Sequence, residues 1–168
     1  MPGINTKVSA STFQQCDGSN FSTAGLDVGI AAGRGSVGVY GGIGTSFTGG
    51  STGVIFDIKG SVPYGNSPLS GGFRVRHNIN GNSKTVQFRF QPATVNIPVG
   101  DKTKIYATPY VATKVNYKTG KADTSIGCFA GVSQKLGKAS VFLEGQIYDA
   151  SHINAGTTSV NAGVSIPL

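Results

Sequence analysis

Residues 123–168 read DTSIGCFAGVSQKLGKASVFLEGQIYDASHINAGTTSVNAGVSIPL, and this stretch decides the fold. In three segments, apolar residues occupy nearly every second position: Ile126, Cys128, Ala130 and Val132, then Ala139, Val141, Leu143 and Ile147, then Val160, Ala162, Val164 and Ile166. A period of two is the pattern of a half-buried strand. Residues 135–138 form a tight turn, and residues 149–157 a longer connection. The stretch predicts three consecutive antiparallel strands.

The same pattern continues upstream. Residues 73–90 predict a hairpin, with its turn at Asn80-Gly81-Asn82, and residues 48–51 predict another turn. Pro92 and Pro98 bracket a stretch that we expect to be extended but irregular, because proline cannot donate to a ladder. We count nine segments, or eight to ten allowing for a further strand or a merged pair. Residues 1–22 are predicted to be an N-terminal tail or an edge strand, and residues 23–168 a single barrel domain.

Composition agrees with an all-β protein. The chain has 168 residues, enough for one domain, and its 26 glycines and single glutamate leave little helix-forming material. Sequential antiparallel strands in this number either close into a barrel or split into a sandwich, and closure best removes exposed edges. We therefore expect an antiparallel up-and-down β-barrel of about eight to ten strands.

Alternation alone does not say which face of the barrel is apolar. A soluble barrel points its apolar face inward, and a membrane barrel points it outward. Charged residues make up 12% of the chain, well below the roughly 25% of soluble domains, which favours the membrane. The net charge of +7 fits either an anionic partner or simple solubility.

The predicted hairpin separates its charges from its aromatic rings. Three arginines lie on the face opposite Phe73, Phe88 and Phe90, so a nucleic-acid base stacked on a ring could not also contact them, which argues against nucleic-acid binding. If the arginine face lines a lumen, acids on the polar faces of other strands are its natural partners. The sequence thus predicts a charge network, in the lumen or on the surface, of Asp27, Asp57, Arg74, Arg76, Arg89 and Glu144, with Gln146 beside it.

Motifs for catalysis are weak. His77 lies on an apolar face and His152 in a loop, and the sequence contains no Ser/His/Asp signature and no metal-ligand spacing. Residues 33–38 match a dinucleotide-binding glycine spacing, but a strand follows where a helix is needed. We expect no enzymatic activity, no metal and no cofactor. Cys128 lies on the apolar face of its segment and is predicted to be a buried free thiol, as opposed to a disulfide partner of Cys16.

Residues 125–133, the short Gly137-Lys138 turn and the final SVNAGVSIPL together resemble the closing strands of small bacterial outer-membrane barrels of the opacity and adhesin kind. The resemblance covers the C-terminal third. The chain departs from that family by ending in Leu168 instead of an aromatic residue, with Pro167 inside the last segment. The resemblance implies an integral barrel whose partner is a lipid bilayer or detergent. It also implies a role in adhesion, surface protection, virulence or envelope integrity.

The alternative is a soluble secreted barrel. It would hold Phe56, Phe73, Phe88 and Leu143 inside, and it would act on a small apolar ligand or, like an effector, on a host protein. Residues 1–15 contain no apolar run that could be a signal-peptide core. We therefore expect the protein to be located in the bacterial outer membrane if a signal peptide has been removed. The alternative is that it is secreted.

Overall fold

The computed structural model describes residues 3–46, 49–80 and 84–168. Gly81 and Asn82 of one predicted turn, and Thr48 of another, lie outside the described residues. Ten strands follow one another along the chain: β1 (Ile4–Gln15), β2 (Asn20–Ala32), β3 (Gly35–Ser46), β4 (Ser51–Pro63), β5 (Leu69–Asn80), β6 (Lys84–Val99), β7 (Thr103–Asn116), β8 (Lys121–Leu136), β9 (Ala139–Ile147) and β10 (Thr158–Pro167). The described residues contain no helix that could cross a membrane.

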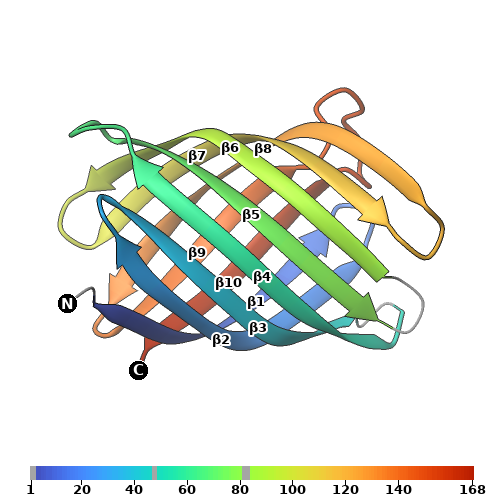
Figure 1. The fold of residues 1–168 in the computed structure, drawn as a ribbon, viewed down its shortest axis with the longest axis horizontal. Coiled ribbons are helices and arrows are strands. Elements are labelled where there is room, and N and C mark those ends of the chain that lie inside the picture. The colour runs from blue at the N-terminus through green and yellow to red at the C-terminus, as the bar shows by residue number, and fades with distance from the viewer. Residues whose placement is uncertain (1–2, 47–48, 81–83) are drawn as a thin grey trace.

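The ten strands form a closed antiparallel barrel in which each strand pairs with its neighbours in sequence, and β1 pairs with β10. This confirms the predicted up-and-down barrel, at the upper limit of the predicted strand count. Both termini lie at one end of the barrel, and the β9–β10 loop lies at the other (Figure 1). An even number of antiparallel strands requires this placement of the termini.

Two segments differ from the sequence prediction. The predicted N-terminal tail or edge strand contains β1, which has a neighbour on both sides: residues 4–14 pair with β2 and residues 7–15 pair with β10. The stretch between Pro92 and Pro98 is extended, as predicted, but it belongs to β6, and its irregularity is confined to a register shift between Phe90 and Val95. The shift is a bulge, the kind of site at which a sheet accommodates proline.

The apolar face of every strand points outward. Large apolar side chains from all around the barrel are exposed on its outer surface, among them Leu26, Ile43, Val54, Phe56, Phe73, Phe88, Phe90, Ile126, Leu143 and Val160. The residues between them point inward and are mostly polar, aromatic or glycine. Phe56, Phe73, Phe88 and Leu143 are 47%, 45%, 51% and 53% exposed, so the interior that the soluble alternative required does not form.

Glycines make room for aromatic rings inside the barrel. Tyr40 of β3 is buried, and its ring lies over Gly42. A Cβ on Gly42 would come within 2.5 Å of the Ala24 carbonyl oxygen and of the Tyr40 hydroxyl. The neighbouring Gly41 faces outward, where a Cβ would meet nothing within 4 Å. The two glycines therefore serve different purposes although they are adjacent.

We predict that Gly42→Ala lowers the free energy of unfolding by about 1–3 kcal/mol, because its methyl group overpacks the interior. Gly41→Ala should change it by less than about 0.5 kcal/mol, as at other open surface positions. Urea unfolding of the refolded barrel in micelles, followed by circular dichroism, measures both variants. Equal effects of the two substitutions would contradict this packing.

Candidate functional site in the barrel lumen

A cavity of about 760 Å³ lies inside the barrel. Its lining includes Gln15 at the end of β1 and Gly156 in the β9–β10 loop, so it reaches the end of the barrel opposite the termini. The charged side chains of the lining are Arg74, Arg76, Arg89, Lys114, Asp123 and Glu144. The lumen is therefore a polar chamber, and it is the candidate functional site of the protein.

Two carboxylates bind cationic side chains of β1, β4 and β5. Arg76 donates two hydrogen bonds to Asp57, each of 2.7 Å, in a bidentate pair across the β4–β5 register. Asp27 accepts a hydrogen bond from the Lys59 ammonium, and the Lys7 nitrogen lies 4.0 Å away. Both carboxylates are buried. Charge-assisted hydrogen bonds of this kind satisfy the oxygens of a buried carboxylate.

Arg74 and Arg89 have different surroundings. They are directly opposite each other in the β5–β6 register. Arg74 donates a hydrogen bond of 3.3 Å to Gln87, and the Arg89 guanidinium lies 4.0 Å from the centre of the Tyr110 ring. A guanidinium over an aromatic face is a stabilising cation–π contact. These two arginines are therefore held by an amide and a ring.

Glu144 and Gln146 of β9 are bound to tyrosines of β7. Tyr106 donates a hydrogen bond of 3.0 Å to Glu144, and Gln146 donates one of 2.7 Å to the Tyr110 hydroxyl. The Tyr110 hydroxyl in turn donates to the Ile147 carbonyl. Each of these tyrosines uses its ring to fill space and its hydroxyl to satisfy a polar group, as buried tyrosines usually do.

All six predicted network residues, Asp27, Asp57, Arg74, Arg76, Arg89 and Glu144, point into the barrel, but they do not form one network. The structure brings Asp57 to Arg76, while Asp27 meets lysines and Glu144 meets a tyrosine. The sequence analysis missed Lys59, Lys7, Tyr106 and Tyr110 as partners. Each occupies an inward-facing position in its strand, which the alternation of the sequence could have indicated. Only the register between strands shows which of these side chains meet.

His77 lies on the outer face of the barrel, where its ring nitrogen bonds to the Tyr117 hydroxyl. Cys16 and Cys128 are both free. Cys128 is exposed on the outside of β8, so the prediction of a buried thiol is wrong, because the apolar face of this barrel is its exterior.

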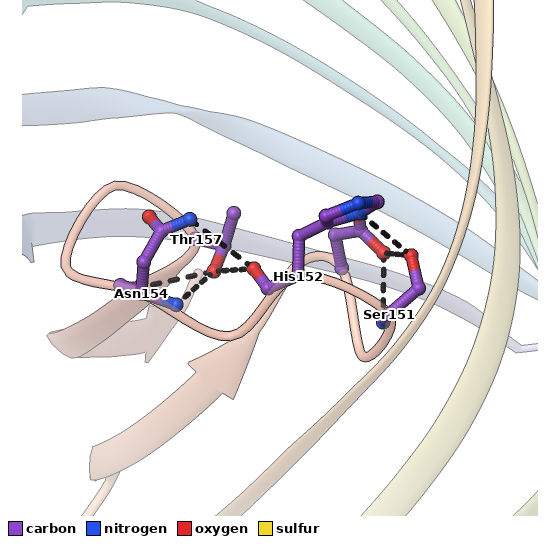
Figure 2. Close-up of polar contacts among 5 residues, drawn as sticks. Ser151, His152, Asn154 and Thr157 are labelled. Carbon is purple, nitrogen blue, oxygen red and sulfur yellow. Dashed lines mark hydrogen bonds and ion pairs between the residues drawn. The ribbon is translucent and has the colours of Figure 1, made fainter.

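The β9–β10 loop, residues 148–157, is the longest described connection and is held by its own polar groups. The Ser151 amide and hydroxyl both donate to the Asp149 carboxylate, and His152 Nδ1 lies 3.1 Å from the same group. Thr157 donates to the His152 carbonyl and accepts from the Asn154 amide (Figure 2). The loop therefore presents a defined polar surface at the end of the barrel opposite the termini.

No protein-family model matches the chain, and no curated protein matches its sequence. Several solved barrels are similar to it, among them the following three. A structure described as de novo design of transmembrane β-barrels has a TM-score of 0.47 and 11% identity, over 100% of this chain and 98% of its own. OmpT, an outer membrane protein of Vibrio cholerae, has a TM-score of 0.40 and 17% identity, over 95% and 64%. The β domain of the Bordetella autotransporter Brka has a TM-score of 0.43 and 11% identity, over 98% of both chains.

The inner and outer faces of the barrel also allow a comparison with known architectures. A closed antiparallel barrel with an apolar exterior, a polar interior and short turns has the architecture of outer-membrane barrels. The resemblance drawn from residues 123–168 is confirmed at this level.

We predict that Asp57→Asn lowers the free energy of unfolding by about 1.5–3 kcal/mol, because it leaves the Arg76 guanidinium without its bidentate carboxylate. Asp101→Asn, in an exposed turn, removes the same charge and should change stability by less than about 0.5 kcal/mol. Denaturant unfolding in micelles distinguishes the two variants. An unchanged stability of Asp57→Asn would show that this ion pair contributes nothing.

The hydrogen bonds from Ser151 lower the pKa of Asp149 below its usual range. The contacts are made by the ionised carboxylate. Their stabilising effect is therefore fully present at a pH above the usual pKa of an aspartate, and it is lost as the pH falls through the lowered pKa of Asp149. We predict that Ser151→Ala raises the pKa of Asp149, measured by NMR titration in micelles. Ser67→Ala, in a loop at the other end of the barrel, is the matched control. A pKa of Asp149 that Ser151→Ala does not change would contradict the contact.

Proposed function

We propose that the protein is an integral β-barrel of the bacterial outer membrane that acts without chemistry, in envelope integrity, surface protection or adhesion. The observation that carries this proposal is the band of large apolar side chains around the whole exterior. In water, so large an apolar surface would drive aggregation, whereas a bilayer covers it. The lipid bilayer, or detergent in its place, is then the principal partner.

Strand length supports a membrane-spanning barrel. A transmembrane β-strand needs about 9–11 residues. The shortest strand, β9, has 9 residues, and β6 and β8 have 16 each. Closure also satisfies the backbone, since every strand has a hydrogen-bonded neighbour on both sides and a bilayer offers no water to unpaired groups.

Loop lengths support an orientation. Turns at the end with the termini have two to five residues, from residues 137–138 to residues 64–68, while the β9–β10 loop at the other end has ten. Outer-membrane barrels keep short turns on the periplasmic side and longer loops outside. The β9–β10 loop would then face the cell exterior, and its ordered polar surface is the part of the chain that an adhesive or protective contact would use.

Two features support a role without chemistry. His77 lies on the outer face and His152 in an exposed loop, both away from the lumen lining. Within residues 3–46, 49–80 and 84–168, no group of three His, Cys, Asp or Glu side chains is placed to hold a metal ion.

A matched pair of leucines tests membrane insertion. Leu143, in the middle of β9, and Leu136, the last residue of β8, both face outward and are 53% and 54% exposed. In liposomes we predict that Leu143→Arg costs about 2–4 kcal/mol of stability and Leu136→Arg at most about 1 kcal/mol, because the penalty depends on depth in the bilayer. A soluble monomer in detergent-free buffer that tolerates both substitutions equally would overturn the proposal.

A further inference from the structure

The lumen contains a pair of arginines whose positive charges are not matched by acids. Arg74 and Arg89 occupy directly opposed positions in the β5–β6 register, and both point into the cavity. Like charges directly opposite each other on one face of a sheet are destabilising. Such a pair persists in a fold when something nearby compensates the repulsion.

The acidic side chains of the protein compensate this repulsion only in part, because Asp57 and Glu144 act on the arginines from a distance. The chain has seven of them, all within the described residues, and none forms an ion pair within 4.0 Å of Arg74 or Arg89. Asp57 is bound by Arg76, and Asp27 by Lys59. Glu144, which lines the same cavity as the two arginines, accepts a hydrogen bond from Tyr106. The two arginines therefore retain most of their ability to bind an anion.

Their hydrogen-bond donors are also largely unused. A guanidinium has five N–H donors. Arg74 uses one of them on Gln87, and Arg89, 6% exposed, lies over the Tyr110 ring. The Nε atoms of both arginines are buried and meet no acceptor among the residues that the structure describes. A buried donor without an acceptor is costly, so the chain itself leaves both guanidinium groups incompletely satisfied.

The cavity in front of the pair has the size and charge for such a group. Four cations and two acids line the cavity, which gives a net charge of +2, or +1 when Asp57 behind Arg76 is included. Its volume of about 760 Å³ lies within the roughly 300–1,000 Å³ of small-molecule sites. The strands enclose this space, so lipid headgroups outside the barrel do not reach it.

We propose that Arg74 and Arg89 form a binding site in the lumen for a small oxyanion, a phosphate or carboxylate group carried by a free solute. Two guanidinium forks match the paired oxygens of such a group, and charge-assisted hydrogen bonds of this kind are stronger than neutral ones. Gln87 fixes Arg74 and the Tyr110 ring fixes Arg89, so the donors are held in place before the anion binds. The proposal goes beyond the membrane role and does not depend on it, because the lumen is the same in either environment.

Isothermal titration calorimetry of the refolded barrel with inorganic phosphate tests the site, in a non-ionic detergent at low, constant ionic strength. We expect saturable binding by the native protein. Arg74→Gln and Arg89→Gln should each weaken binding about tenfold or more, the loss of a hydrogen bond to a charged group. Arg34→Gln, in the exposed β2–β3 turn, removes the same charge outside the lumen and should bind as the native protein does.

Circular dichroism and the heat-dependent gel mobility of each sample show whether the barrel has folded, independently of binding. A folded native barrel without saturable heat would overturn the proposal, as would equal binding by the Arg74→Gln/Arg89→Gln double variant. If a single arginine variant fails to fold, Gln87→Leu provides the second route, because it frees Arg74 from its amide partner without removing a charge. Weaker phosphate binding by Gln87→Leu supports the site, and unchanged binding contradicts the role of Arg74 in it.

Discussion

The pairing of β1 with β10 gives every strand of the barrel two hydrogen-bonded neighbours, and the rest of the structure depends on this closure. Once the sheet is closed, strand alternation assigns each residue to the inside or the outside. The apolar side chains form a continuous outer surface, and the polar ones share a lumen. A membrane admits only such structures, in which backbone groups are satisfied internally. The fold therefore meets the constraint that a membrane sets on its proteins.

Closure also explains why charge is concentrated inside. With a lipid-facing exterior, the arginines, lysines and acids of the strands have only the lumen in which to meet. There the bidentate Asp57–Arg76 pair satisfies both of its members, whereas Arg74 and Arg89 are held by an amide and an aromatic ring. The same interior thus combines structural ion pairs with unmatched cations, and the unmatched cations give the lumen its capacity to bind an anion.

Much of the fold could be predicted from the sequence where the outer face is strongly apolar, as in Val54, Phe56 and Ile58 of β4. Prediction failed for β1, whose outward positions include Ala10 and Thr12 and so show little alternation. At residues 92–98 it found an irregular extended stretch but not its place in β6, because a bulge lets the strand continue past proline. Inward-facing members of the charge network could be found by parity, but their partners could not, since these depend on register between strands far apart in the sequence.

The central claim is that the apolar face of the barrel is covered by lipid, and the two native cysteines test it most directly. Cys128 lies at the middle of β8 on the outer face, and Cys16 follows the end of β1; both are exposed on the isolated barrel. The refolded protein in liposomes would be treated with a membrane-impermeant maleimide on both sides and analysed by mass spectrometry. The account predicts labelling of Cys16 and protection of Cys128 until the protein is unfolded. Equally fast labelling of both cysteines would contradict it.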